Sequence, residues 1–328
     1  MNATDIILSC RVRLARNVRG LPFVSQMSME QAESFIRTVD NAINTSGEYR
    51  LMHMVDLGDN ERMRLVERHL CSRELAVEPK GALLLNKDET MSIMINEEDH
   101  IRIQCILPGL DLFEADARSR VVDNQLSKAL DVAFDEQLGY LTACPTNIGT
   151  GMRASAMIHI PALAMSGQAE QVLSAAAKLG VAVRGFYGEG SDAPGHIYQI
   201  SNQNSLGISE EDIVTGLTET IGRIAEQEKR FRLGALSQND IGIRDLVFRS
   251  YGVCRYAQIM KFGEFMRRCS DLKMGVSLGL IAGITQERLN ELIASGQSAS
   301  LCAASGKLLN EAQENIARAQ LLRRALKG

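Results

Sequence analysis

The sequence predicts an α+β protein, in which an antiparallel-rich sheet flanked by helices is followed by a small all-helical domain. Segments whose residues alternate between apolar and polar, as strands do, recur up to about residue 201. Segments with apolar residues at helical spacing stand between them. From about residue 231 onward every pattern is helical. We therefore expect a first domain at residues 1–230 and a helical domain at residues 231–328.

The first predicted element is a strand at residues 5–13, where apolar and polar residues alternate. Arg11 and Arg13 have the same parity, so they share one face of this strand. A helix is expected to begin after Ser28, because Gln31 stands at the capping-box spacing and apolar residues follow at helical intervals. Further strands are expected at residues 82–85, 91–95 and 100–106.

The middle of the chain continues with helices and strands. Between residues 111 and 138 an apolar residue recurs at every fourth position, which predicts one helix with an apolar face. The recurring residues are Val122, Leu126, Leu130 and Phe134. A strand with Arg153 and Ser155 on one face is expected next, at residues 152–160. The sheet is completed by a helix at 170–179 and by strands at 181–184 and 196–201.

The last predicted elements are helices. Ser209 and Asp212 have the spacing of a helix N-cap, and the helix that follows leads into the charged residues 227–232, where we place the domain boundary. Apolar residues at 243, 247, 251 and 254 predict the next helix. Another is expected to start at Thr285 and end at Gly296, and residues 311–327 form a closing stretch with a basic end.

Composition narrows the class of protein. The chain of 328 residues is 45% hydrophobic and 23% charged, and its formal net charge of −4 argues against a direct nucleic-acid partner. No apolar run is long enough to span a bilayer and no secretory signal is recognisable, so we expect a cytoplasmic protein without a membrane partner. The seven cysteines are scattered and form no Cys-x-x-Cys pair, which predicts neither a zinc site nor disulfides.

No sequence motif for cradling phosphate with backbone groups is present. The chain lacks a Gly-x-x-x-x-Gly-Lys-Ser/Thr loop. Gly188, Gly190 and Ala193 fit Gly-x-Gly-x-x-Ala, but Pro194 and a strand follow where a dinucleotide site needs a helix. If the chain binds phosphate, its side chains must do so.

Arginines are the candidates, because a guanidinium stays charged and forks onto phosphate oxygens. Strand parity or a glycine-rich turn aims several of them at one surface: Arg11, Arg13, Arg102, Arg153 and Arg184. For each of them alone, a solvated charge on a sheet face is the ordinary alternative. Arg11 and Arg13 share a face of one strand, where like charges repel unless an anion lies between them.

An acidic turn is expected at residues 96–102, just before a strand. A polar hairpin tip is the simpler interpretation. Glu98 and Arg102 have the same parity, however, so we expect a carboxylate and a guanidinium to point together into a cleft. A second carboxylate, Glu189, stands between Gly188 and Gly190, in a loop able to close on a ligand.

Three segments resemble the signatures of the ATP:guanido phosphotransferases, in that family's order: SCRVRLARN at 9–17, NEEDHIR at 96–102 and CPTNIGTGMRAS at 144–155. Arg184 followed by Gly188-Glu189 resembles a fourth. The resemblance covers residues 5 to about 230 and implies the phosphagen-kinase catalytic fold, which is glutamine-synthetase-like. The helical remainder resembles the domain found in the bacterial protein-arginine kinases of this family, for which it implies interaction or dimerisation.

The resemblance also implies roles for single residues. ATP phosphates would be held by Arg11, Arg13, Arg102, Arg153 and Arg184. Glu98 and Glu189 would grip the substrate guanidinium, with Glu98 as the base and the Cys144 thiolate beside it. Glu97 would contact Mg²⁺ through water. His69 and Ser9 would contact the nucleotide. Without the resemblance, Cys144 would be taken for a buried structural cysteine, and His69 is equally well a surface histidine.

A protein arginine is the expected acceptor. Kinases of small guanidines carry a helical N-terminal domain that closes over the metabolite, whereas the arginine-bearing strand here begins a few residues after Met1. The resemblance implies a zinc-containing activator, a Clp-type protease, a heat-shock repressor and a homodimer as partners. The alternatives are a kinase of free arginine or another small guanidine, and a catalytically silent protein that binds nucleotide or phosphoarginine.

One segment departs from the family. The last domain of its bacterial members carries an Arg-Asp-x-x-Arg-Ala motif that binds phosphoarginine, but residues 314–319 here read ENIARA. The first two positions have lost the motif's charge pattern. We therefore predict that phosphoarginine does not activate this chain through residues 311–324.

Overall fold

The computed structural model describes residues 5–185 and 193–327. The chain divides into two compact units. One, here called the sheet unit, comprises residues 10–155 and 201–218. The other, here called the helical unit, comprises residues 1–9, 156–200 and 219–328. Glu189 lies outside the described residues, so its expected place opposite Glu98 is untested.

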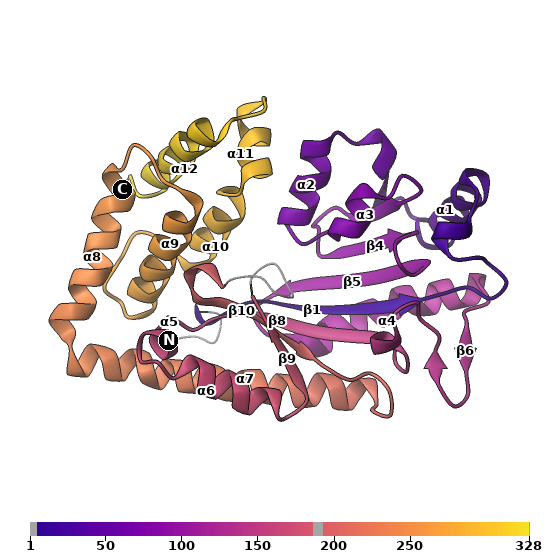
Figure 1. The fold of residues 1–328 in the computed structure, drawn as a ribbon, viewed down its shortest axis with the longest axis horizontal. Coiled ribbons are helices and arrows are strands. Elements are labelled where there is room, and N and C mark those ends of the chain that lie inside the picture. The colour runs from indigo at the N-terminus through magenta and orange to yellow at the C-terminus, as the bar shows by residue number, and fades with distance from the viewer. Residues whose placement is uncertain (1–4, 186–192, 328) are drawn as a thin grey trace. The chain divides into compact units, whose positions relative to one another are not determined.

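Eight strands form one sheet in the order β2-β3-β4-β5-β1-β8-β10-β9 (Figure 1). Their bounds are β1 Ile7–Arg16, β2 Tyr49–His53, β3 Ala82–Asn86, β4 Met91–Ile95, β5 Ile101–Pro108, β8 Met152–His159, β9 Val181–Arg184 and β10 Ile197–Asn202. Strands β2 to β5 are antiparallel neighbours. β1 and β8 also run in opposite directions, because Ala15 N donates to Gly151 O at one end and His159 N to Ile6 O at the other. The predicted fold class, α+β with an antiparallel-rich sheet, is confirmed.

Two groups of helices pack within the sheet unit. Its helical segments are η2 Val24–Gln26, α1 Met29–Ile43, η3 Met54–Asp56, α2 Asp59–Glu67, α3 Arg73–Val77, α4 Leu112–Ala129 and η4 Pro145–Asn147. α4 contacts both β5 and α1. α2 and α3 share a buried apolar core with β2, β3 and β4, which includes Met52, Leu75, Leu83 and Met94. α4 therefore packs on β5, which carries Arg102, whereas α2 and α3 pack on β2, β3 and β4.

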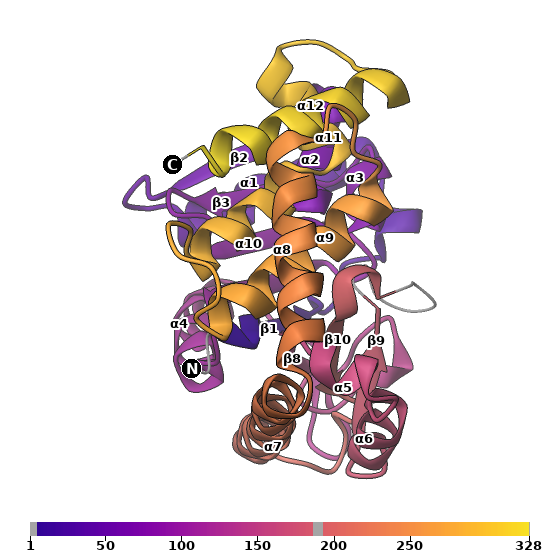
Figure 2. The same ribbon diagram turned by 90° about the vertical axis from the view of Figure 1, so that its left-hand side faces the viewer.

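The helical unit is built around α9. Its helical segments are α5 Pro161–Met165, α6 Ala169–Ala177, η5 Pro194–His196, α8 Asp240–Tyr256, α9 Phe262–Ser277, α10 Gln286–Ser295, α11 Ser298–Ser305 and α12 Glu311–Ala325. α9 contacts α8, α10 and α12, which lie around it in Figure 2. Phe265, Met266, Cys269 and Leu272 of α9 are fully buried in the core of this unit. The remaining helix, α7 Glu210–Gln238, has residues in both units.

Charged side chains are buried inside the helical unit, where they pair with one another. Arg232 Nε donates to Glu228 Oε1 at 2.7 Å, and Arg232 Nη2 donates to His159 O at 2.9 Å. The Glu228 carboxylate also accepts the backbone N–H groups of Ala162 and Leu163, at the start of α5. Buried charges are tolerated only when they are paired and hydrogen-bonded in this way. The network therefore joins the ends of β8, α5 and α7.

Most predicted elements are confirmed, with shifts of a few residues at their ends. α1 begins after Ser28, whose Oγ accepts Gln31 N at 3.1 Å while Gln31 Oε1 accepts Ser28 N at 2.9 Å, as a capping box requires. α10 is capped by Thr285 and ends at Gly296. Within the described ranges, no helix is both long and apolar enough to cross a bilayer.

The helix expected at residues 111–138 is wrong in its second half. α4 ends at Ala129, and Leu130 is extended. Phe134 belongs to β6 (Phe134–Asp135), which pairs with β7 (Gly139–Tyr140) as a separate hairpin (Figure 1). Backbone pairing with the chain after β1 overrides the four-residue spacing, because Arg19 N donates to Asp131 O and Ala133 N to Asn17 O, both at 2.8 Å.

Candidate functional site

Arginines from three adjacent strands gather on one face of the sheet. β5, β1 and β8 are neighbours, and they carry Arg102, Arg11 with Arg13, and Arg153. The hydrogen bond between Ala15 and Gly151 sets a register in which Arg13 lies opposite Arg153. All of these side chains are half-buried, while the alternate residues of β1, Cys10, Val12 and Leu14, are fully buried. Strand parity therefore turns the guanidinium groups to the same face.

The arginines of this cluster lie close enough to lower one another's pKa. Burial and then Arg153 and Arg102 lower the pKa of Arg11 to about 10. Burial and then Arg11, Arg102 and Arg153 hold the pKa of Arg13 well below its ordinary value. Arg11 donates to two neutral acceptors, Ser155 Oγ at 3.4 Å and Gln104 Oε1 at 3.5 Å. Among the described residues, Nε of Arg13 is buried without a hydrogen-bond partner, so an anion could accept a hydrogen bond from it.

Glu97, rather than Glu98, is the close partner of Arg102. Arg102 Nη1 lies 2.6 Å from Glu97 Oε2 and donates to Oε1 at 2.9 Å, and the Glu97 side chain is 1% exposed. Glu98 Oε1 is 3.9 Å from Arg102 Nη2, and its side chain is 41% exposed. Arg102 and Glu98 do lie near each other, as expected, but at 3.9 Å they are farther apart than Arg102 and Glu97. The sequence pattern did not identify Glu97 as the neutralising carboxylate.

Glu98 is left available to act on an incoming group. Burial raises the pKa of its carboxyl group, Arg102 lowers it, and Asp99 and Glu97 raise it further, with a net upward shift. A carboxylate with a raised pKa accepts a proton more readily than an ordinary glutamate. An exposed carboxylate beside an arginine cluster thus has the properties of a general base.

The turn between β4 and β5 holds both glutamates in place. Asn96 has a left-handed backbone (φ 58°), and its N–H donates to His100 O at 2.9 Å. The Asn96 side chain donates to the carbonyl oxygens of Ala32 and Lys80. The ring of His100 is buried, where its Nδ1 accepts Val18 N at 3.0 Å. His100 is therefore a structural residue, although it has the same parity as Glu98 and Arg102.

Cys144 differs from the other cysteines. The remaining six are buried, whereas Cys144 is half-buried at the start of η4. Its Sγ lies 3.0 Å from Thr146 Oγ1. The thiol is therefore accessible for chemistry, and it is not the buried structural cysteine that composition alone would suggest.

His69 lies beside the arginine cluster. It is half-buried, has a left-handed backbone (φ 59°) and follows α2. Burial and then Arg11 and Arg13 lower the pKa of its imidazole to about 4, so the ring is neutral at pH 7. Gln104 Nε2 donates to His69 O at 2.8 Å and to Ser92 Oγ at 2.9 Å. Gln104 was missed in the sequence, although it has the same strand parity as Arg102.

Two predicted residues belong to the helical unit. Ser9 lies on β1 two residues before Arg11, and so on the same face of that strand. Arg184 is the last residue of β9. The structure thus brings together four of the five predicted arginines with Glu97, Glu98 and His69, all within the sheet unit.

Comparison with known proteins decides the family. A family model described as "ATP:guanido phosphotransferase, C-terminal catalytic domain" matches residues 30–231, more than half of the chain. The chain belongs to the ATP:guanido phosphotransferase family. A second model, described as "Protein-arginine kinase McsB C-terminal domain", matches residues 240–328 of this phosphotransferase.

Relatives that match nearly the whole chain are named protein-arginine kinases. The phosphotransferase is 44% identical over 99% of its length to a protein-arginine kinase of Moorella thermoacetica, of which it covers 95%. It is 42% identical over 98% of its length to the protein-arginine kinase of Bacillus subtilis, of which it covers 90%.

Two solved kinase structures are similar in fold to this phosphotransferase. A lombricine kinase matches 70% of this phosphotransferase and 68% of its own chain, with a TM-score of 0.61 and 25% identity. The duplicated taurocyamine kinase of Schistosoma mansoni, with bound transition-state analogue components, matches 79% of this phosphotransferase and 38% of its own chain, with a TM-score of 0.61 and 26% identity.

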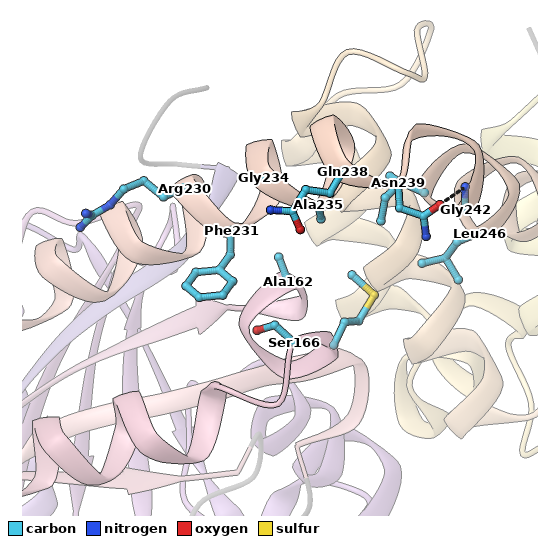
Figure 3. A pocket seen from close by; sticks show the side chains of 12 residues that line it. Ala162, Ser166, Arg230, Phe231, Gly234, Ala235, Gln238, Asn239, Gly242 and Leu246 are labelled. Carbon is cyan, nitrogen blue, oxygen red and sulfur yellow. Dashed lines mark hydrogen bonds between the residues drawn. The ribbon is translucent and has the colours of Figure 1, made fainter.

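The phosphotransferase also has a hollow of about 570 Å³ in its helical unit. Figure 3 shows Phe231 and Gln238 of α7 facing Ala162 and Ser166. Met165 and Leu246 also line it. The lining contains no carboxylate or thiol and none of the predicted site residues. It therefore lacks the groups that phosphoryl transfer to a guanidinium needs.

Proposed function

We propose that this chain transfers the γ-phosphoryl group of ATP to the guanidinium of arginine residues in proteins. The observation that carries the proposal is the arginine cluster on β5, β1 and β8, whose charges lower the pKa of Arg13 and which lies next to the exposed carboxylate of Glu98. A cluster of this kind suits an anion with several phosphate groups, and the carboxylate suits a cationic acceptor.

ATP would bind through Arg11, Arg13, Arg102 and Arg153, joined by Arg184 in the complete site. Their charges neutralise the phosphoryl group as it moves between oxygen and nitrogen, which is the main source of catalysis in such reactions. His69 is neutral at pH 7, so it contacts the nucleotide base without adding charge. Ser9 would contribute from the same face of β1.

Mg²⁺ fits this site as a companion of the nucleotide. Within the described part of the chain, no group of three His, Cys, Asp or Glu residues would hold a metal ion by itself. Mg²⁺ ordinarily binds phosphates and waters with only one or two carboxylates. The Glu97 carboxylate is engaged by Arg102, so we assign it a contact through water. The ion would neutralise phosphate charge there.

The acceptor needs a base. The arginine side chain has a pKa of about 13.8, so its neutral form costs roughly 9 kcal/mol at pH 7. Glu98 takes the proton while the guanidinium nitrogen bonds to the γ-phosphorus, and the bond from that phosphorus to the β-phosphate oxygen breaks, releasing ADP. Glu189 is the second carboxylate that orients the guanidinium, and the Cys144 thiolate adds a negative charge beside it.

The protein acceptor is favoured because full-length relatives are named protein-arginine kinases and because residues 240–328 match the domain described for them. We propose residues 1–230 as the catalytic domain and 231–328 as the domain for interaction and dimerisation. We further propose that the enzyme acts in the cytoplasm, where its seven free cysteines stay reduced, with a zinc-containing activator, a Clp-type protease and a heat-shock repressor as partners.

Incubation of the protein with labelled ATP and either an unfolded protein or free arginine tests this function. We expect acid-labile phosphate on the arginines of the unfolded protein, and much less on free arginine. The variant Arg13→Met serves as the inactive control, and Arg37→Met as a matched control, because Arg37 is an exposed arginine of α1 paired with Glu33. Label on free arginine alone would favour a small-guanidine kinase. Nucleotide binding without any labelled product would favour a silent regulator.

A further inference from the structure

Asn17 and Asp99 form a buried hydrogen-bonded pair, here called the Asn17–Asp99 link, next to the turn that carries Glu98. Asn17 follows β1 and Asp99 lies in the turn before β5, and their residues are 4% and 0% exposed. Asn17 Nδ2 donates to Asp99 Oδ1 at 2.7 Å. Asn17 Oδ1 accepts His100 N at 2.9 Å. The two side chains thus fix each other within the sheet unit.

The same link reaches the loop that carries Cys144. Asp99 Oδ1 also accepts Ala143 N at 2.7 Å, and Asn17 Nδ2 also donates to Leu141 O at 3.0 Å. Asp99 is the residue after Glu98, and Ala143 is the residue before Cys144. One buried carboxylate oxygen therefore sits one residue away from both groups that are proposed to contact the acceptor guanidinium.

Burial of the Asp99 carboxylate costs free energy of folding, which its hydrogen bonds must offset. Asp99 Oδ2 is buried and makes no hydrogen bond among the described residues. A buried carboxylate with one unsatisfied oxygen destabilises a fold unless its other contacts compensate. Those contacts are two short hydrogen bonds, and both serve to join the Glu98 turn to the Cys144 loop.

We propose that Asn17 and Asp99 are positioning residues of this enzyme, which set the Cys144 thiol against the Glu98 carboxylate through the N–H of Ala143. The inference rests on the proposed function for its kinetic consequence. Its structural part does not, because the position of a thiol can be measured without any catalysis.

The decisive variants are Asp99→Ala, which removes the link, and Asp99→Asn, which keeps an oxygen that accepts from Ala143 and Asn17. Ser119→Ala is a matched control, because Ser119 is a buried polar residue of the sheet unit whose hydroxyl donates to Ala115 O within α4. Each protein is treated with iodoacetamide, and alkylation is followed at Cys144 by peptide mapping. The other cysteines are buried, which makes the signal selective.

We expect alkylation of Cys144 to be at least about 5-fold faster in Asp99→Ala, because the loop is freed, and kcat for a protein substrate to fall by about 10- to 100-fold. The affinity for ATP, measured by calorimetry, should stay within about 3-fold of the original value, because the arginine cluster is untouched. Asp99→Asn and Ser119→Ala should resemble the original protein in all three measurements.

A folded Asp99→Ala protein with unchanged alkylation would overturn the proposal, as would a parallel loss of ATP affinity in the same variant. If Asp99→Ala does not fold, Asn17→Ser provides the same comparison, since it removes the donors to Asp99 and Leu141 and leaves the carboxylate in place. Faster alkylation in a protein that never phosphorylates arginine would support the link and reject the proposed function, so the two failures are distinguishable.

Discussion

Arg13 of β1 lies opposite Arg153 of β8, in the register set by the hydrogen bond between Ala15 and Gly151. Like charges at directly opposed strand positions repel each other. Arg153 Nη2 donates to Ser201 Oγ at 3.0 Å. Burial and the charges of Arg11, Arg102 and Arg153 lower the pKa of Arg13, so an anion beside Arg13 would relieve this repulsion.

Replacement of Arg13 by Met should change the affinity for ATP and the stability of the fold in opposite directions. Because one of the repelling charges is lost, we expect the unliganded protein to unfold at the same or a higher temperature, with a gain of up to about 1 kcal/mol. ATP affinity should fall by at least about 10-fold, since one charged phosphate contact is removed. Thermal melts with and without ATP measure both effects. A variant that melts earlier and still gains the full increase with ATP would contradict this assignment.

The pH dependence of the reaction should report Glu98. Its carboxyl pKa is raised, chiefly by burial, and the base is active only when deprotonated. The rate should therefore be lost, as pH falls, at a higher pH than an ordinary glutamate would give. Glu98→Gln should lower kcat by about 10²- to 10⁴-fold and leave ATP affinity nearly unchanged. An acid limb that persists in a still active Glu98→Gln enzyme would assign the base to another group.

Phosphoarginine should not activate this enzyme through residues 311–324. Arg318 is 1% exposed, and its guanidinium donates to Gly296 O at 2.7 Å, Met260 O at 3.1 Å and Asn315 Oδ1 at 2.8 Å. These acceptors already use the donors that a phosphate would need. Initial rates with and without free phosphoarginine test the expectation. A rate change that Arg318→Lys abolishes would refute it.

Lys273 should make stability depend on pH. It is fully buried, donates to Gln286 Oε1 and Asn290 Oδ1, and has its pKa lowered to about 7, first by burial and then by Arg232. Above pH 7 the unfolded chain binds this proton and the folded chain does not, so stability rises with pH from about 7 toward the ordinary lysine value. We expect urea melts to show about 1–3 kcal/mol more stability at pH 9 than at pH 7, relative to Lys273→Met. Equal slopes in both proteins would show that Lys273 stays charged.

The sheet and its arginines were predictable from sequence because both follow from a two-residue period. Alternation at β1, β5 and β8 fixed which residues face which way, and Arg11, Arg13, Arg102 and Arg153 share one face as expected. Strand parity gives the face on which a side chain lies, but it does not predict which residue across a turn or on a neighbouring strand is the closest partner. That is why Glu97 was not identified as the partner of Arg102.

Long-range backbone pairing was beyond the sequence pattern. Phe134 continues the spacing of α4, but the chain before it pairs with residues after β1, and its ring packs on Tyr140 with centroids 5.2 Å apart. Asn17 and Asp99 were likewise visible only as parts of polar segments. Asn17 bonds to Leu141 and Asp99 to Ala143, and these contacts depend on three distant segments of the chain meeting, which no local pattern predicts.

The buried network around Arg232 limits how the polypeptide can be shortened. Arg232 follows residue 230, whereas its partners Glu228 and His159 precede it. A fragment ending at residue 230 would retain an interior carboxylate without its counterion, and such fragments tend to be degraded in cells rather than purified. Expression of the catalytic region by itself therefore has to extend at least through the last turn of α7, at Gln238.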